Sequence, residues 1–368
     1  MKGCVQEKLM RERRSWIDCA RICAIFCVVL CHAVENFYGS VIRGEAQVGG
    51  GLWFAENTLF TIGRLGVPLF LAISGALLLE RELTPGRFYR KSLLPLFVTT
   101  EIWIVLNYFF ACVFQGMVFR LPDLISEMCF LRTLELSHMW YMPMILGIYL
   151  VLPFLSVIAR SATDMKAFRL PYLIGIFAFV LIPTVNVFLS EAVPGGEPLK
   201  FKLELDFLGG LYGLYLFGGY FITRYRVLEK VKSRYLVLAA GLAFLLNTAG
   251  QYYLYINEYY KSSRLLWYSS FFIFVMGMIL FEGIRRGFDH PQVYVPEAVE
   301  EMARCSFGIY LLHKPIQILV ASYLPLERWN TVAGILLLLA AGLGISLLFL
   351  LPFKRRWRKA GRLLFLIK

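Results

Sequence analysis

Long apolar runs, separated by short polar segments, follow one another along nearly the whole chain. A helix needs roughly 20 consecutive apolar residues to cross the hydrocarbon core of a bilayer. The predicted spans lie near residues 16–36, 58–79, 93–114, 138–158, 168–190, 207–223, 234–256, 265–283, 306–323 and 332–353. The run at 207–223 is short and rich in glycine, which favours close helix packing. The pattern predicts an all-α fold, a polytopic membrane bundle of about ten transmembrane helices.

The composition agrees with this pattern. Of the 368 residues, 58% are hydrophobic and 17% are charged, and the mean hydropathy is +0.64. Such values are typical of a membrane protein rather than of a soluble domain. The polar segments between the runs contain no long soluble stretch, so residues 1–368 are predicted to form a single integral membrane domain.

Basic residues are distributed unevenly between the two sides of this predicted bundle. With a cytoplasmic N-terminus, 27 of the 38 lysines and arginines lie in inside segments and 8 lie in outside loops. The remaining three, Arg21, Arg64 and Lys314, lie within the spans. The positive-inside rule therefore predicts that the N- and C-termini are both cytoplasmic. Because this bias explains most of the net charge of +13, we expect no nucleic-acid binding.

The first span carries a stripe of ionisable residues. Arg21 and His32 are eleven residues apart, which returns a helix to within roughly 20° of its starting direction and about 16 Å along its axis. Asp18 and Glu35 fall on the same side. Ionisable groups at membrane depth are costly and usually face a cavity or a partner. The stripe therefore predicts a polar pocket inside the bundle.

His32 and Glu35 are the candidate catalytic residues of this stripe. A neutral imidazole can take a proton from a hydroxyl group near pH 7, and Glu35, one turn away, can orient the ring or balance its charge. Asp18 is placed to hold the guanidinium of Arg21. The alternative interpretation of His32 is a histidine at the interfacial end of a span, and the aligned stripe favours the catalytic one.

Further polar residues lie at membrane depth in other spans. His138 and His313 are each interpreted equally well as site residues or as structural ones. Arg64 either pairs with a carboxylate such as Glu101 or, like His138, stabilises an oxyanion. Most of these residues lie toward the outside, whereas Arg21 lies toward the inside. Such an asymmetry suits a reaction in which one substrate enters from each side.

Four cysteines in the first span are spaced by four residues: Cys19, Cys23, Cys27 and Cys31. One helix cannot place four thiolates tetrahedrally around an ion, so we interpret them as a ridge of small residues for helix packing. No metal site is predicted.

A basic segment precedes the third predicted span. Arg87, Arg90 and Lys91 lie there, on the cytoplasmic side in this topology. They are placed to clamp a phosphorylated cofactor through charge-assisted hydrogen bonds. The alternative interpretation is positive-inside anchoring, which alone accounts for such a cluster.

Four segments of the chain resemble acyltransferase family 3, a family of integral membrane acyltransferases, in the expected order. They are Asp18 and Arg21 followed by His32; Arg64-Leu-Gly-Val-Pro68-Leu-Phe-Leu-Ala-Ile-Ser74-Gly75; His138-Met-Trp140-Tyr141 with Tyr149 and Pro153; and Ser306-Phe-Gly-Ile-Tyr310-Leu-Leu-His313. Each segment is moderately specific alone, but four in the expected order on ten spans are a strong signal together, and the resemblance runs over most of the chain.

The resemblance implies a reaction, its partners and a location in the cell. It implies that an acyl group, usually acetyl, passes from cytoplasmic acyl-CoA to a hydroxyl or amine of an extracytoplasmic glycan or its lipid-linked precursor. The partners would be the lipid bilayer, acyl-CoA and a carbohydrate acceptor, at the cytoplasmic membrane of a bacterial cell.

The resemblance also implies roles for individual residues. His32 would be the catalytic histidine, and Arg21, held by Asp18, would bind or position the donor. The CoA phosphates would meet the segment with Arg87, Arg90 and Lys91, although Ser92 stands where many members carry arginine and leaves the register open. The residues expected to bind substrate or stabilise the oxyanion are Arg64, His138, Trp140, Tyr141, Tyr310 and His313.

A transporter or sensor for a small amino-acid-like molecule is the alternative function. The same polar interior would pass a small zwitterion, and helices broken by glycine or proline in two matching halves would favour this interpretation. The sequence has no convincing internal repeat, so the acyltransferase interpretation ranks above it. Acyl-CoA binding distinguishes the two. The sequence predicts neither the acceptor's identity nor the oligomeric state.

Overall fold

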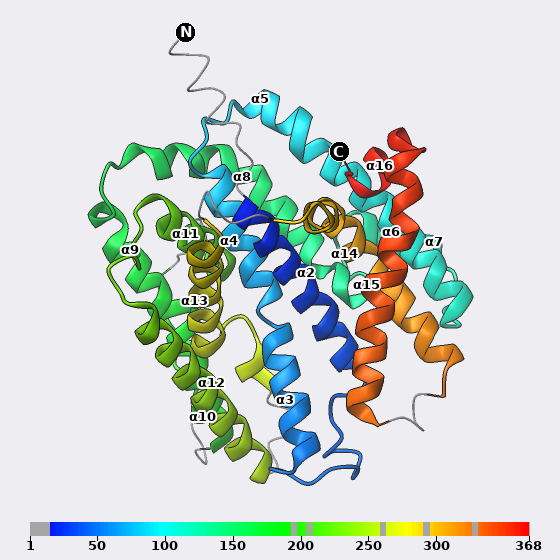
Figure 1. The fold of residues 1–368 in the computed structure, drawn as a ribbon, viewed down its shortest axis with the longest axis horizontal. Helices are drawn as coiled ribbons and strands as arrows, with labels where there is room; N and C mark the ends of the chain where they lie inside the picture. Colours follow the sequence, from blue (N-terminus) through cyan, green and yellow to red (C-terminus); the bar gives the residue numbers. More distant parts are fainter. Residues whose placement is uncertain are drawn as a thin grey trace.

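The computed structural model describes residues 15–192, 197–203, 206, 209–257, 263–289, 295–325 and 330–367. Every regular element within these residues is a helix or a helical turn (Figure 1). The helices are α2 (Ser15–Glu35), α3 (Gly51–Gly63), α4 (Gly66–Leu78), α5 (Pro85–Phe88), α6 (Leu94–Phe114), α7 (Leu121–Met128), α8 (Tyr141–Ser161), α9 (Lys166–Ile176), α10 (Ile182–Ala192), α11 (Gly210–Arg224), α12 (Ser233–Ile256), α13 (Phe271–Phe288), α14 (Glu297–Tyr323), α15 (Thr331–Arg355) and α16 (Arg358–Phe365). The helical turns are η1 (Tyr89–Leu93), η2 (Ser137–Trp140), η3 (Phe177–Leu181) and η5 (Ser263–Leu266). The predicted all-α class is confirmed.

Seven helical segments of the described chain are long and apolar enough to cross a membrane. They are Ser15–Glu35, Gly51–Leu78, Pro85–Phe114, Ser137–Ser161, Lys166–Ser190, Ser233–Ile256 and Thr331–Arg355, and each contains one predicted apolar run or most of it. The chain is therefore a multi-pass membrane protein.

The count of ten spans is not confirmed, because the other three predicted spans form shorter or more polar helices. The run at 207–223, of which 207–208 lie outside the described residues, gives α11, with only 15 residues. The run at 265–283 gives α13, which has Glu282, Arg285 and Arg286 in its last turns. The run at 306–323 gives α14, which carries His313 and Lys314 midway along its length.

The second predicted span differs from its expected form. It begins at Gly51 rather than near residue 58, and it is interrupted at Arg64, between α3 and α4. Added Cβ atoms at Gly63 and Gly66 would lie 2.7 Å from backbone atoms of α2, so both helix ends lie directly against α2. Pro68 is tolerated because the first turn of α4 needs no amide donor there. The interruption leaves Arg64 buried beside the end of α2.

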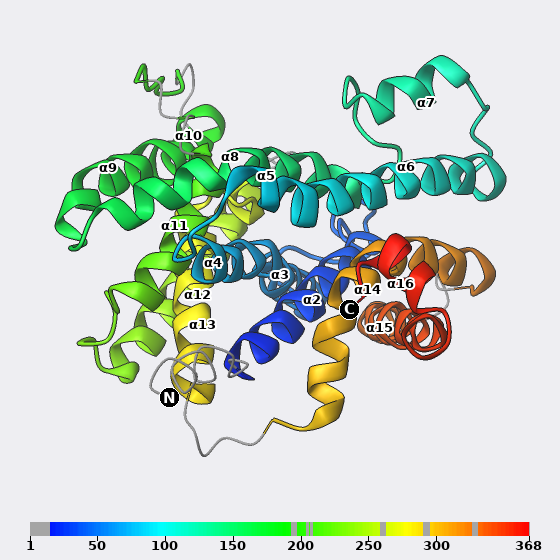
Figure 2. The ribbon, with the colours of Figure 1, turned by 90° about the horizontal axis from the view of Figure 1, so that it is seen from above.

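Helix α2 lies in the middle of the bundle. It contacts α3, α4, α13, α14 and α15, and Figures 1 and 2 show it enclosed by these helices. Most of its side chains are buried, including Trp16 near its start and His32 near its end. Trp16 packs edge-on against Phe281 of α13, with ring centroids 5.4 Å apart. Asp18 and His32 of the predicted ionisable stripe are therefore buried inside the protein, whereas Arg21 and Glu35 are partly exposed.

Glycines bring α4 and α11 into backbone contact. A Cβ atom added at Gly75 would lie 1.7 Å from the carbonyl oxygen of Leu216, and one at Gly219 would lie 2.1 Å from that of Ala72. Any side chain at these positions would force the helices apart. The close packing expected of the glycine-rich segment is confirmed.

Candidate functional site

The centre of the candidate site is a histidine–carboxylate pair at the end of α2. His32 Nδ1 lies 2.6 Å from Glu35 Oε2, and the two residues are three positions apart on the helix. Because an ionised carboxylate only accepts hydrogen bonds, Nδ1 is the N–H donor and Nε2 carries the lone pair. His32 Nε2 has no hydrogen-bond partner among the described residues. Glu35 therefore fixes the tautomer and leaves a basic nitrogen available.

Two cations from other helices converge on the same carboxylate. Lys314 Nζ of α14 lies 3.4 Å from Glu35 Oε2, and Arg64 Nη2 lies 3.7 Å from Oε1. The pairing of Arg64 with Glu101 that the sequence allowed is not formed. Two nearby positive charges keep Glu35 ionised, as its role toward His32 requires. The sequence assigned no role to Lys314, although a lysine within an apolar span is by itself an indication of a functional site.

Three histidines from separate segments form one cluster. The ring centroid of His32 lies 6.1 Å from that of His138 and 5.2 Å from that of His313, and His138 and His313 are 5.2 Å apart. His313 Nδ1 donates to the carbonyls of Ile309 and Tyr310, so its Nε2 carries the lone pair. Both ring nitrogens of His138 are buried, and apart from a loose contact with the backbone of Leu311 neither has a hydrogen-bond partner.

Polar contacts hold the histidine-bearing segments together. Tyr310 Oη of α14 donates to the carbonyl of His138 at 2.8 Å, which fixes η2 against α14. Gln317 Nε2, one turn after His313, donates to the carbonyl of Val29 at 3.0 Å and ties α14 to α2. The relative positions of the three imidazoles therefore depend on α14 packing against both other segments.

The cysteine ridge of α2 packs into the core. The four cysteines of α2 are free, and Cys27 and Cys31 are buried among core side chains, as expected of a packing ridge. In the part of the chain that the structure describes, no group of three or more His, Cys, Asp or Glu side chains is arranged to hold a metal ion.

Aromatic rings surround Arg64. Its Cζ lies 4.5 Å from the ring centroid of Phe60, 4.8 Å from that of Trp267 and 5.8 Å from that of Tyr268. Trp140 packs on Tyr268 with centroids 5.6 Å apart. Such cation–π contacts hold the guanidinium in place. Glu35 pairs with Nη2 of this guanidinium, whereas its Nε has no hydrogen-bond partner.

Tyr141 and Tyr310 connect this aromatic group to the histidines. Their ring centroids are 5.7 Å apart, and the ring of Tyr310 lies 5.6 Å from that of His138. The structure therefore brings together eight predicted site residues: His32, Glu35, Arg64, His138, Trp140, Tyr141, Tyr310 and His313.

Arg21 and Asp18 lie at the other end of α2, away from this group. Arg21 Nη1 is 3.2 Å from Asp18 Oδ1, the pairing that the spacing indicated. Asp18 is 1% exposed, whereas the side chain of Arg21 is 35% exposed. A buried carboxylate thus anchors a guanidinium that remains accessible at the end of the bundle where α2 begins.

The basic segment before α6 lies near that same end. Arg87 belongs to α5 and Arg90 and Lys91 to η1, and all three are exposed and without an ion pair to any described residue. Phe88, between them, packs against Tyr149 of α8 with centroids 5.7 Å apart. The basic segment is therefore held against α8 by Phe88.

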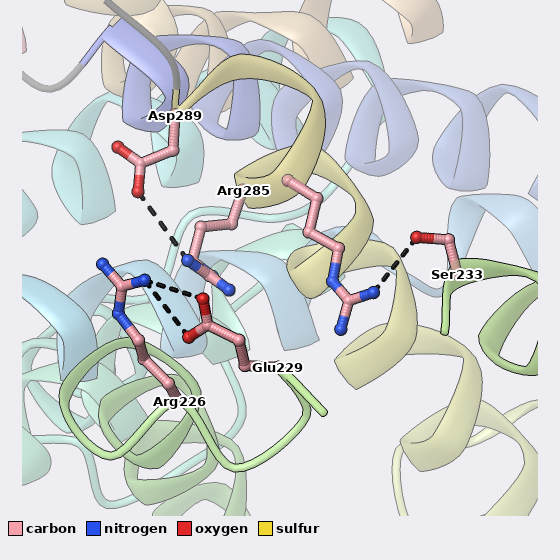
Figure 3. A pocket seen from close by; sticks show the side chains of 6 residues that line it. Arg226, Glu229, Ser233, Arg285 and Asp289 are labelled. Atoms are coloured by element: carbon pink, nitrogen blue, oxygen red, sulfur yellow. Dashed lines mark hydrogen bonds and ion pairs between the residues drawn. The ribbon is translucent and has the colours of Figure 1, made fainter. Parts of the chain in front are cut away.

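A further cleft of about 560 Å³ lies where the loop after α11 meets the end of α13 (Figure 3). Its arginines are all engaged: Arg226 with Glu229, Arg285 with Asp289, and Arg286 with Ser233. Arg285 and Arg286 also bond to buried Glu282. Three cations face three carboxylates, so the cleft has little net charge with which to attract a phosphate. We interpret it as a structural clasp.

Comparison with known proteins gives one match. The model of acyltransferase family 3, described as an acyltransferase domain, matches residues 14–351, which is nearly the whole chain. Searches of curated proteins and of solved structures find no match. The matched region contains the histidine cluster, the Arg21–Asp18 pair and the basic segment.

Proposed function

Because the chain belongs to acyltransferase family 3, we propose that it transfers an acetyl group from cytoplasmic acyl-CoA to a hydroxyl of an extracytoplasmic glycan or its lipid-linked precursor. The family makes the protein a membrane acyltransferase; the donor, the acyl group and the acceptor are the proposed part. One observation carries the proposal: His32 lies inside the bundle with Nδ1 bound to Glu35 and Nε2 available.

The proposed chemistry is a direct acyl transfer. His32 Nε2 takes the proton from the acceptor hydroxyl while the hydroxyl oxygen attacks the thioester carbonyl. The imidazolium that forms is stabilised by ionised Glu35, 2.6 Å from Nδ1. Collapse of the tetrahedral intermediate breaks the carbon–sulfur bond, and His32 returns the proton to the CoA thiolate. The products are an ester and CoA thiol. An acyl-histidine route would use the same Nε2 as nucleophile.

The oxyanion of this intermediate needs a donor near His32. His138 is suited to this role because its imidazole carries an N–H donor and its ring lies next to that of His32, with centroids 6.1 Å apart. Arg64, 3.7 Å from Glu35, adds positive charge on the same side. We assign the oxyanion to His138, with Arg64 as a positioning residue for Glu35.

The donor side is proposed at the opposite end of α2. CoA carries phosphates, and Arg87, Arg90 and Lys91 are exposed cations without protein counterions, so they fit such a group. Arg21 then lies between these cations and His32, about 16 Å below it along the helix, a length that an extended pantetheine arm spans. The two substrates would meet at His32 from opposite sides.

The direct test is His32→Ala, with Cys19→Ala on the same helix as a control. Acetylation of cell-surface glycan is measured by mass spectrometry at matched protein levels. We expect a loss of about 10²-fold or more for His32→Ala, the range of general-base catalysis, and no loss for the control. Normal acetylation by a well-folded His32→Ala protein would remove the catalytic assignment.

A transporter makes a different prediction about the donor. Purified in detergent, the wild-type protein should bind acetyl-CoA, and Arg21→Ala should weaken that binding. A transporter of small zwitterions should show no such binding.

A further inference from the structure

A row of buried polar atoms without partners lies between α3 and α12. From α3 it includes Trp53 Nε1 and Asn57 Oδ1, and from α12 it includes Asn247 Oδ1 and both amide atoms of Gln251. All four residues are at most 2% exposed. Trp53 and Asn57 are four positions apart, as are Asn247 and Gln251, so each pair lies on one helix face. We call these four residues the polar seam.

The two faces of the polar seam meet. Asn247 Nδ2 lies 3.4 Å from Thr61 Oγ1 of α3, and the ring of Trp53 lies 5.8 Å from that of Tyr255 of α12. Buried polar atoms are almost always hydrogen-bonded in native proteins, to protein or to ordered water. Several such orphaned atoms on two adjoining helices therefore point to a place that takes up a polar molecule.

The polar seam leads to the histidine cluster. Tyr255 Oη, beside Trp53, lies 3.1 Å from Tyr38 Oη, and Tyr38 packs on Phe60 with centroids 4.6 Å apart. Phe60 in turn lies under Arg64, which pairs with Glu35. Trp53 also packs against Tyr252, which is 42% exposed. Contacts thus run from an exposed tyrosine to the base of the reaction.

The chemistry of the polar seam selects its ligand. Carboxamide groups and an indole N–H both donate to and accept from hydroxyl groups, and the aromatic rings offer flat faces to a sugar. No cation belongs to the seam, and the nearest ionisable side chain on the same stretch of α3 is Glu56, 2% exposed with Oε1 unpartnered. A carboxyl group of this kind exchanges hydrogen bonds with hydroxyl groups.

We propose that the polar seam is the acceptor subsite and holds an uncharged, hydroxyl-rich sugar residue of the glycan. This assignment rests on the proposed function and names the residues that recognise its acceptor. The acceptor would enter beside Tyr252 and present a hydroxyl to His32 past Arg64.

The test compares Gln251→Leu and Trp53→Phe with Asn107→Leu. Asn107 of α6 is also buried with an unpartnered amide nitrogen but lies outside the seam, so it controls for the loss of a buried amide. Trp53→Phe keeps most of the packing and removes only the indole donor. Membranes containing each protein receive radiolabelled acetyl-CoA and unacetylated surface glycan prepared from a strain that lacks the gene.

The seam variants should raise the half-saturating glycan concentration about tenfold, the effect of one lost hydrogen bond of about 1.4 kcal/mol. Their half-saturating acetyl-CoA concentration should not change, and Asn107→Leu should change neither. A glycan dependence equal to wild type in a folded seam variant would overturn the assignment, as would parallel changes for both substrates. If the wild-type protein labels no glycan, the proposed function fails and this assignment with it. Labelling by wild type with unaltered seam variants contradicts only the assignment.

Discussion

Glu35 is the residue at which the charges of the site converge. It accepts from His32 and lies within 4 Å of both Lys314 and Arg64. A carboxylate in this position fixes the imidazole tautomer and, in the proposed mechanism, balances the imidazolium that forms during transfer. It also gives two buried cations a counterion, so the proposal assigns one side chain a catalytic and a structural role.

Replacing Glu35 by glutamine removes the charge on which both roles depend. Glu35→Gln keeps the size of the side chain but removes its charge, so His32 loses the stabilisation of its protonated form. We expect the acetyl transfer rate at saturating substrate to fall about 10²–10⁴-fold. Glu45→Gln, an exposed carboxylate that pairs with Arg43, serves as the control and should act like wild type. A Glu35→Gln protein with an unchanged rate would show that His32 works without its carboxylate.

At the scale of elements, glycines set the distances between helices. Gly63 and Gly66 bring the interrupted second span onto α2, and Gly75 and Gly219 bring α4 onto α11. The first contact places Arg64 beside Glu35, and the second fixes α4, which follows Arg64 directly. Helix spacing is thus coupled to the geometry of the site.

Gly75→Ala tests this coupling. Its Cβ atom would lie 1.7 Å from a backbone oxygen, which cannot rotate away, so α4 and α11 must separate. We expect a destabilisation of about 3 kcal/mol or more, seen as a lower yield of monodisperse protein and a lower unfolding temperature in detergent. Gly147→Ala is the matched control, because Gly147 is at an exposed position of α8 and nothing lies within 4 Å of its Cβ position. Equal behaviour of the two variants would refute a packing role for Gly75.

At the scale of the whole molecule, the bundle separates two chemical environments. The histidine cluster lies where α2 ends, whereas Arg21 and the exposed basic segment lie where α2 begins. The distribution of lysine and arginine predicts that the second end is cytoplasmic. In the proposed function, this polarity would let one substrate arrive from each side.

Topology fusions check this polarity. Green fluorescent protein fused after residue 368 should fluoresce, because the C-terminus is predicted to be cytoplasmic. Alkaline phosphatase inserted near residue 45 should be active, and the same insertion near residue 83 should be inactive. The reverse pattern at residues 45 and 83 would place the basic segment outside the cell, where it would not meet acyl-CoA.

The sequence by itself determined the helical class, most of the span boundaries, and the contacts within single helices. The His32–Glu35 and Asp18–Arg21 pairs follow from helical periodicity, because residues three apart on a helix are neighbours whatever the helix packs against. The resemblance to a family also came from short stretches of sequence, and the family match agrees with it.

Only the tertiary structure decided which helices meet. The grouping of His32 with His138 and His313, the choice of Glu35 as the partner of Arg64 and Lys314, and the polar seam all join residues that are far apart in the chain. The interruption at Arg64 was also invisible in an apolar run that reads as continuous. Periodicity shows which face of a helix is polar, but the partner of that face depends on the packing of side chains from every neighbouring helix.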